Sequence, residues 1–264
     1  MTQRSSPNSP PHQHRPNDAA PAASLPDLIQ ERAPELLLKA ASDLRMTEDL
    51  ALTLLERRDL PHLVIEKLSK NSAAMKHRKV QNAVVMHPRT PRHVSLPITR
   101  RLYSFELMQI ALTPTVAADL KMFAEEVLIA RLESVSAGER IALAKRGSTR
   151  IAAALLNDAE RRILEAALNN PYLTEMFVVK ALLKAESSQD LVDAVCHHSK
   201  WNLRREVRAA LLRNDKTPMA RAVAIAQGMS SMALRDVLRT SRLPQNVKAY
   251  LERMLEERPQ ATKL

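Results

Sequence analysis

Hydrophobic residues recur at helical spacing along most of the chain from residue 25 onward. In the segment TEDLALTLLERR, Leu50, Leu54 and Leu55 mark one apolar face, and Thr47 stands where a helix N-cap is expected. Ala, Leu, Arg, Glu and Met dominate the chain, and these residues are good helix formers. The pattern therefore predicts an all-α protein.

The sequence contains internal repeats of this pattern. Residues 205–255 align without a gap with residues 78–128, which lie 127 positions earlier, and a further copy begins at Arg161. We call the matching apolar residues the anchor positions; they are separated by 40, 43, 44 and 40 residues and comprise Val80, Leu120, Ile163, Val207 and Val247. Stacked helical repeats of the HEAT and armadillo types have periods of about 40–47 residues. The sequence thus predicts an α-solenoid, a superhelix of stacked units of 40–44 residues, over residues 25–258.

Each unit has room for three short helices. In the last complete unit we expect them at about residues 203–213, 218–228 and 231–240. Thr217-Pro218 is typical of a helix start, with threonine as the N-cap and proline as the first helical residue, and Thr90-Pro91 repeats it.

Two further sequence features bear on helix boundaries. Ser136 and Glu139 form a capping-box pattern, which predicts a helix start. Pro97 stands where a helix interior is expected, so we expect it to kink or split that helix. Apolar residues at helical spacing in the last unit should form a continuous core; they are Ala210, Leu211, Leu212, Val223, Leu234, Val237 and Leu238.

The turns between helices resemble those of a known family. The phrases at residues 87–91, 170–174 and 214–218 are similar to the Asn-Pro-x-Thr-Pro turn of bacterial leucine-rich-repeat-variant proteins, and the period resembles that of HEAT and armadillo-like repeats. The resemblance covers about residues 47–255 and implies an extended curved surface used for binding. Members of the variant family can carry an iron–sulfur cluster on an N-terminal cysteine group, which this chain, with one cysteine, does not share.

Composition narrows the possible functions. The chain has three glycines, so glycine-rich loops that cradle phosphates are nearly excluded. Cys196 is the single cysteine, which excludes a disulfide framework and a cysteine-rich metal site and favours a reducing, cytoplasmic location. No apolar stretch reaches the roughly 18–20 residues of a membrane span. We expect no cofactor and no metal.

The two ends of the chain differ from the body. Residues 1–24 contain five prolines and almost no large apolar side chain. Such a segment buries too little apolar surface to offset the conformational entropy lost on folding, so we expect a disordered, Pro-rich tail. Residues 259–264 are expected to form a short C-terminal tail.

Charge is the main indication of a partner. The formal net charge is +11, and residues 67–105, which we call the basic segment, contain no Asp or Glu. Equivalent positions of a solenoid line up along one surface, so the segment predicts either a cationic stripe or an ordinary solvated face. The candidate anion- or partner-binding residues in it are Lys67, Lys70, Lys76, Arg78, Lys79, Arg89, Arg92, Arg100 and Arg101.

A second basic cluster surrounds Trp201. The candidates in it are Arg204, Arg205 and Arg208, with Lys200, Arg213, Lys216 and Arg221 nearby. Trp201 could stack on a base or an aromatic side chain of a partner beside arginine. It also stands at the start of a helix, where packing in the joint between units is commoner, and we favour that interpretation.

No catalytic constellation emerges from the sequence. Cys196 and His197 are adjacent in a helix and point about 100° apart, so they cannot form a facing nucleophile and base. We therefore predict a non-enzymatic scaffold that binds a protein or an acidic peptide segment through its basic surface, with the oligomeric state left open. The alternatives are nucleic-acid binding through the same residues and, third, a base-processing enzyme on the HEAT-like fold shared by bacterial alkylpurine DNA glycosylases, with Trp201 as the aromatic residue.

Overall fold

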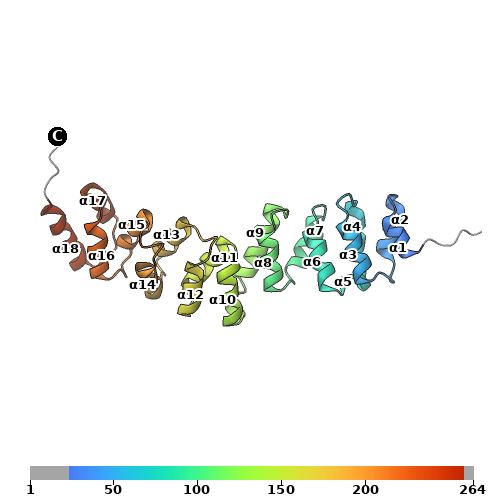
Figure 1. Ribbon diagram of the computed structural model, residues 1–264, viewed down its shortest axis with the longest axis horizontal. Coiled ribbons are helices and arrows are strands. Elements are labelled where there is room, and N and C mark those ends of the chain that lie inside the picture. The colour runs from blue at the N-terminus through green and yellow to red at the C-terminus, as the bar shows by residue number, and fades with distance from the viewer. Residues whose placement is uncertain (1–23, 259–264) are drawn as a thin grey trace, which may run out of the picture. The chain divides into compact units, whose positions relative to one another are not determined.

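The computed structural model describes residues 24–258, and this part of the chain is helical throughout. It contains 18 α-helices and two short 3-10 helices, and no strand occurs within it (Figure 1). The all-α prediction is confirmed. Residues 1–23 and 259–264, which make up nearly all of the two predicted tails, lie outside the described residues. Ser24, which the sequence assigns to the tail, is the N-cap residue of the first helix.

The described chain divides into two compact units between Gln81 and Asn82. The boundary falls inside α6 (Arg78–Met86). The first unit contains α1 (Leu25–Gln30), α2 (Pro34–Ser42), α3 (Glu48–Glu56), α4 (His62–Ser69) and α5 (Ser72–Met75).

The second unit holds the longer part of the array. It contains α7 (Arg92–Thr99), α8 (Ser104–Leu112), α9 (Ala118–Ile129), η1 (Leu132–Ser134), α10 (Ala137–Arg146), α11 (Thr149–Ala154), η2 (Leu155–Asn157), α12 (Arg161–Leu168), α13 (Glu175–Leu183), α14 (Gln189–His197), α15 (Arg205–Arg213), α16 (Met219–Gln227), α17 (Ser231–Arg239) and α18 (Gln245–Glu256). The three helices predicted in the last complete repeat correspond to α15, α16 and α17. Each of them begins and ends within two residues of the predicted bounds.

Many of the helices pack against the helix two places further along the chain, and several also pack against the next helix. In the second unit α7 contacts α9, α9 contacts α11, α11 contacts α13, α13 contacts α15 and α15 contacts α17, while α10 contacts α12, α12 contacts α14 and α16 contacts α18. The first unit shows the same relation between α1 and α3 and between α2 and α4. Short links between consecutive helices favour this alternation, because a chain that turns back after each helix returns to its starting side with the next one.

Side chains at the end of one helix close the open carbonyl groups at the end of the helix two places earlier. Asn170, after α12, donates from Nδ2 to the carbonyl oxygens of Ala144 (2.7 Å) and Gly147 (3.0 Å) at the end of α10. Asn214, after α15, likewise donates to the carbonyl oxygen of Leu182 in α13 over 2.6 Å. The last four carbonyl groups of an α-helix have no hydrogen-bond donor within the helix, and these side chains supply donors for some of them.

The same contact recurs with other donors. The side chains that make it are Arg57 to Ile29, Asn71 to Ala41, Arg131 to Leu102, Trp201 to Leu168, Ser241 to Leu212 and Arg258 to Met229. In each pair the donor follows or ends one helix and the acceptor lies at or just beyond the end of the helix two places earlier. The C-terminal ends of the two helices therefore lie side by side.

Two predicted helix starts are wrong in their details. Thr217 and Thr90 do not act as N-caps; their hydroxyls donate back to the carbonyl oxygens of Leu211 (2.6 Å) and Val84 (2.5 Å) in the preceding helix. The following proline takes the N-cap position in α16 and α7. A threonine hydroxyl can accept a hydrogen bond from a backbone N–H of the following helix or donate one to a carbonyl oxygen of the preceding helix. Both threonines donate to the preceding helix.

Two other local predictions have clear outcomes. Ser136 is the N-cap of α10, as predicted, and its hydroxyl accepts from the Glu139 amide over 3.3 Å. Pro97 lies inside α7 but does not split it, because α7 runs unbroken from Arg92 to Thr99. The helix has eight residues and Pro97 is close to its end, so the proline removes little of its hydrogen bonding.

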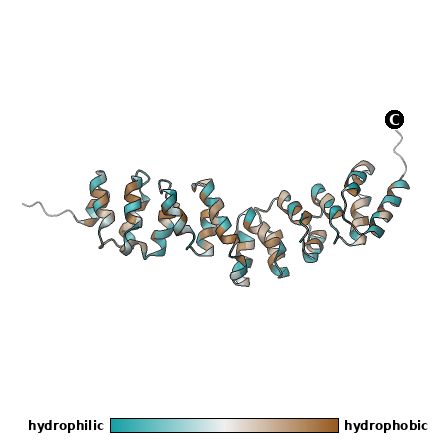
Figure 2. Ribbon diagram, turned by 180° about the vertical axis from the view of Figure 1, so that it is seen from behind, coloured by the Kyte–Doolittle hydropathy of each residue, from teal (hydrophilic) through white to brown (hydrophobic). Residues whose placement is uncertain are grey.

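The anchor positions are all buried and lie in α6, α9, α12, α15 and α18, which are every third helix of the chain. Of the core residues expected in the last unit, six are buried, and Val223 is half-buried. Figure 2 shows the helices with brown, apolar and teal, polar sides, and the apolar residues are aliphatic for the most part. None of the described helices is both long and apolar enough to cross a membrane.

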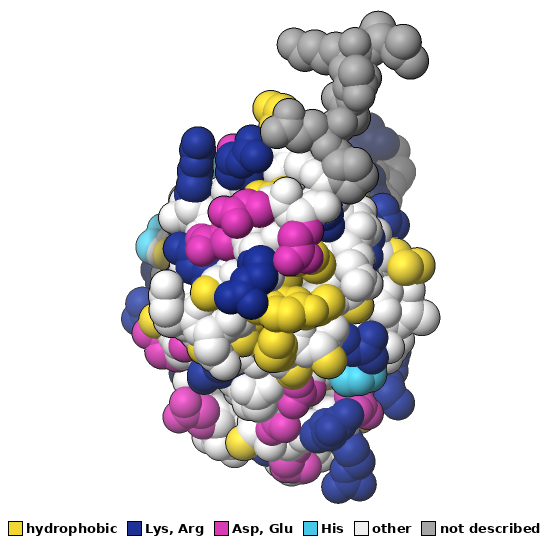
Figure 3. Space-filling model, turned by 90° about the vertical axis from the view of Figure 1, so that its left-hand side faces the viewer, with side chains coloured by type: hydrophobic (Ala, Val, Ile, Leu, Met, Phe, Trp, Pro, Cys, Tyr) yellow, Lys and Arg dark blue, Asp and Glu magenta, His cyan; other side chains and the backbone are white. Residues whose placement is uncertain are grey.

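The C-terminal face of the second unit carries exposed apolar side chains. In the end-on view of Figure 3, they gather near the middle of the face, with acidic and basic side chains around them. The last described helix, α18, contributes the exposed Tyr250 and the half-buried Met254 and Leu255.

Candidate anion and partner interface

The basic segment is divided by the boundary between the two units. Lys67, Lys70, Lys76, Arg78 and Lys79 belong to the first unit, and Arg89, Arg92, Arg100 and Arg101 belong to the second. Several of these side chains are engaged within their own unit by groups that lie outside the segment in sequence.

In the first unit, glutamates from neighbouring positions balance part of the charge. Lys70 pairs with Glu66 over 2.8 Å, and Lys79 pairs with Glu48 over 3.5 Å. Nδ1 of His77 lies 3.1 Å from the same Glu48 carboxylate. Arg78 also interacts with a neighbouring group. The segment lacks acidic residues in its sequence, but its surroundings supply them.

In the second unit, Arg92 forms an ion pair with Asp119 over 2.6 Å, and the guanidinium of Arg100 lies 5.5 Å from the centre of the Phe123 ring. Arg89 and Arg101 likewise have interaction partners. Exposed pairs of this kind contribute about 0–1 kcal/mol each, so they do not block a stronger ligand. They do make the basic segment less distinctive than its sequence suggests.

Trp201 is a packing residue. Its side chain is 1% exposed, and its Nε1 donates to the carbonyl oxygen of Leu168 at the end of α12 over 2.8 Å. The ammonium of Lys200 lies 4.0 Å from the centre of the ring. The packing interpretation is confirmed, and Trp201 is removed from the candidate partner-binding residues because its ring is covered.

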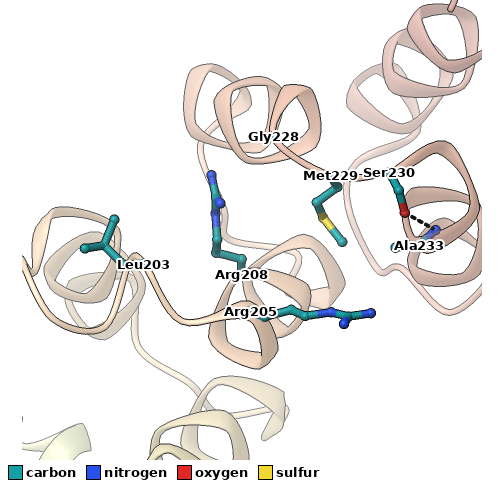
Figure 4. A pocket seen from close by; sticks show the side chains of 7 residues that line it. All are labelled: Leu203, Arg205, Arg208, Gly228, Met229, Ser230 and Ala233. Atoms are coloured by element: carbon teal, nitrogen blue, oxygen red, sulfur yellow. Dashed lines mark hydrogen bonds between the residues drawn. The ribbon is translucent and has the colours of Figure 1, made fainter.

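Two arginines of the second cluster line one cavity. Arg205 and Arg208, one turn apart at the start of α15, line a cavity of about 340 Å³ together with Leu203, the Gly228–Ser230 link and Ala233. Figure 4 shows the Arg208 side chain extending from α15 toward Gly228, while Arg205 leaves the same helix in another direction. Arg204, the N-cap residue of α15, is exposed and does not line this cavity.

A second, smaller cavity of about 130 Å³ adjoins the first. Leu203 and Arg208 line both. The remaining walls of the smaller cavity come from α14, the link that follows it, α15 and α16, and they are Cys196, Asn202, Leu211, Arg221, Ala224 and Ile225. Arg208 thus borders both cavities, with Arg205 as its partner in the wider one and with Arg221 and Asn202 beside apolar walls in the narrower one.

The arginines at these cavities have no acidic counterpart. Among the described residues, no ion pair or hydrogen bond is made by the side chains of Arg205, Arg208 or Arg221, and Nε of Arg208 is buried without an acceptor. A positive side chain in the first turn of a helix is unfavourable because the helix dipole is positive there. Helix stability therefore does not account for Arg205 at the first position of α15, although Glu206 beside it offsets part of the charge.

Gly228 allows Arg208 to lie close to the backbone of the α16–α17 link. A Cβ at this position would lie 3.0 Å from Nη2 of Arg208 and 3.5 Å from Nη1. Any larger residue would therefore press on the guanidinium. Gly228 is one of only three glycines in the chain, and its place close to the arginine cluster is the sequence signal for this role.

The thiol and histidines near the smaller cavity are not arranged for catalysis. Burial raises the pKa of the Cys196 thiol to about 11, while the nearby Arg221 acts in the opposite direction. Nδ1 of His197 lies 2.7 Å from the carbonyl oxygen of Asp193 in its own helix. Burial and the charge of Lys200 lower the pKa of His198. Within residues 24–258, no group of three His, Cys, Asp or Glu side chains is placed to hold a metal ion.

The arrangement can bind an anion next to an apolar group. The sequence found Arg205 and Arg208 but missed the cavity partners Asn202, Leu203 and Met229, which carry no charge pattern. Comparison of the chain with protein families, with curated proteins and with solved structures found no match.

Proposed function

We propose that this chain is a non-enzymatic scaffold, an α-solenoid of HEAT- or armadillo-like units, that binds an acidic segment of a partner protein. The binding residues are Arg205 and Arg208, with Arg221 beside them. The remaining candidates of the basic segment, Lys67, Lys76 and the paired cations around them, are secondary in this proposal because glutamate and aspartate side chains already balance several of their neighbours.

One observation carries the proposal. Two guanidinium groups line one cavity, and the side chains of Arg205 and Arg208 make no ion pair or hydrogen bond to any described residue. Arg205 is exposed and Arg208 is half-buried, so the cost of a missing counter-charge falls on Arg208, whose buried Nε has no acceptor. An anionic ligand that binds there removes that cost. Guanidinium binds carboxylate in a planar, bidentate geometry, so an acidic side chain is a suitable ligand.

The solenoid part of the proposal is supported by two independent periodicities. Contacts between alternate helices recur within each of the two units, and buried anchor residues recur in every third helix from α6 to α18. Proteins in which each unit contacts only its neighbours present long surfaces and commonly use them to bind extended partners.

Nucleic-acid binding is the second candidate, because the same arginines would also bind phosphate groups. The third function, base processing, would need Trp201 in a pocket beside an acidic residue, and the ring is buried between helices. We therefore do not propose it.

The experiment compares a fluorescein-labelled oligoglutamate peptide with a labelled DNA duplex, both titrated with the full chain and followed by fluorescence anisotropy. We expect the peptide to bind, and we expect the double variant Arg205→Glu/Arg208→Glu to weaken its binding by at least about tenfold, since each charge-assisted hydrogen bond contributes about 1.5–3 kcal/mol. The matched control is Lys145→Glu/Arg146→Glu, which changes two exposed cations in the last turn of α10 and alters the net charge equally.

Equal weakening by the two double variants would show that only net charge matters and would refute the assignment of the site. Tight duplex binding that falls steeply with salt, together with no peptide binding, would establish the nucleic-acid alternative in its place.

A further inference from the structure

The two cavities that share Arg208 differ in chemistry, and together they describe one ligand. The wider one presents the guanidinium groups of Arg205 and Arg208 and borders the first turn of α17, where the hydroxyl of Ser230 accepts from the Ala233 amide over 3.3 Å. The positive end of that helix dipole adds to the charge of the arginines. This side of the site is therefore suited to a carboxylate.

The narrower cavity is suited to an aliphatic side chain. Its apolar walls include Cys196, Leu211 and Ile225, all of which are buried, and its volume is about 130 Å³. Its polar side is formed by Asn202, Arg208 and Arg221. The Cys196 thiol stays protonated at neutral pH because burial raises its pKa, so it acts as a small apolar group. An apolar group placed against the apolar walls leaves water, while polar groups of the ligand can face Asn202, Arg208 and Arg221.

Two unpaired polar atoms at the site favour a peptide over other polyanions as the ligand. Oδ1 of Asn202, which also lines the narrow cavity, is buried and has no hydrogen-bond donor, while Nε of Arg208 is buried and has no acceptor. Both atoms are covered, so each side chain must turn toward the ligand to use them. A peptide offers both an N–H donor and oxygen acceptors along its backbone, whereas a phosphodiester backbone offers acceptors only.

We propose that the site recognises a peptide segment in which an acidic residue lies next to an aliphatic residue. The carboxylate binds between Arg205 and Arg208, and the aliphatic side chain enters the narrow cavity beyond Arg208. This inference rests on the proposed function and adds the identity of the motif to it. Gly228 is a positioning residue for the motif, because the absence of a Cβ lets the Arg208 guanidinium stay between the two cavities.

The test uses two labelled peptides of equal length and charge, one alternating glutamate with leucine and the other alternating glutamate with glycine. Both are titrated with the full chain at fixed ionic strength. We expect the Glu–Leu peptide to bind at least about tenfold more tightly, because burial of a leucine side chain adds to an equal charge term.

Three variants test whether the narrow cavity causes the preference for the Glu–Leu peptide. Ala224 is exposed and lines the narrow cavity, so Ala224→Leu should fill the cavity without harming the core and should bring the ratio of the two affinities close to one. Gly228→Ala should weaken the binding of both peptides, because the added Cβ displaces the Arg208 guanidinium. The control Gly138→Ala, at a site with nothing near its Cβ, should change neither affinity nor ratio.

The failures of the two proposals are distinguishable. If wild-type protein binds both peptides equally and Arg205→Glu/Arg208→Glu weakens both, the motif is wrong and the acidic-segment function stands. If a leucine preference persists in Ala224→Leu, the aliphatic residue binds elsewhere and this inference is overturned. If neither peptide binds, the proposed function itself fails.

Discussion

Replacement of Asn170 by alanine should destabilise the second unit far more than the same replacement at the neighbouring Asn169. The Asn170 side chain is 1% exposed, donates to the carbonyl oxygens of Ala144 and Gly147, and accepts from the Tyr172 amide over 2.7 Å. Asn169 is exposed and donates to the Glu165 carbonyl oxygen of its own helix over 2.8 Å. The two variants therefore remove the same atoms from opposite environments.

The expected magnitude follows from the groups that lose a partner. Ala144 and Gly147 are buried, so each carbonyl left without a donor costs about 1–3 kcal/mol, whereas the amide of the exposed Tyr172 can bind water. Because a carbonyl has two lone pairs and the site can relax, we expect a total loss of about 2–4 kcal/mol for Asn170→Ala. Asn169→Ala should change the stability by less than about 0.5 kcal/mol.

Urea denaturation followed by circular dichroism measures the global effect, and amide hydrogen exchange in peptides covering residues 137–175 measures the local one. Exchange is the more direct assay, because an array of helices can open in parts before it unfolds as a whole. Equal losses for the two variants, or faster exchange confined to the Asn169 variant, would refute the view that these side chains join alternate helices.

Two further predictions concern the core around the candidate site. Leu211→Ala should cost about 2–5 kcal/mol in the free energy of unfolding because Leu211 is fully buried, whereas Leu44→Ala, at a residue that is 73% exposed, should be neutral; a neutral Leu211→Ala would contradict the placement of the inner face. The pKa of the Cys196 thiol is raised from 9.0 to about 11, so between these values the unfolded chain ionises while the folded one does not. Stability should therefore fall as pH rises through this range, a thermal melt of Cys196→Ala should lack that part of the decline, and parallel pH profiles for the two proteins would oppose the prediction.

The sequence predicted the helices well because the signals for them are local. Apolar spacing and the Ser136 cap place helix starts within a few residues, and the anchor positions lie in buried parts of α6, α9, α12, α15 and α18. Thr217 shows the limit of such signals, because the same hydroxyl can serve either of two helices and only the packing decides which one.

The contacts between helices could not be predicted in the same way. Sequence similarity recurs after three helices, but packing recurs after two, since packing depends on the direction of each helix and not on which residues resemble each other. The basic segment shows a related limit. Lys79 pairs with Glu48 and Arg92 pairs with Asp119, and both acidic residues lie outside the basic segment. No local sequence pattern predicts these pairs.

The candidate site was predicted in part. Arg205 and Arg208 stand out as charges in the sequence, but their freedom from acidic partners and the cavity between α15 and the α16–α17 link are properties of three-dimensional packing. For Trp201 the favoured prediction, packing at a helix start, is confirmed, but the sequence could not identify the partner of its indole N–H, which is the Leu168 carbonyl oxygen at the end of α12.

The bonds between helix ends have a consequence for changes in chain length. Each donor, such as Asn214, serves a carbonyl on the helix two places earlier, such as that of Leu182. Asn170 and Asn214 make this bond from equivalent positions of successive three-helix repeats. Deletion or duplication of a whole three-helix repeat would therefore keep each such donor beside an acceptor of the same kind, whereas the loss of one helix would bring donors against the wrong ends of their new neighbours. Proteins built on this scheme should therefore differ in length by multiples of three helices.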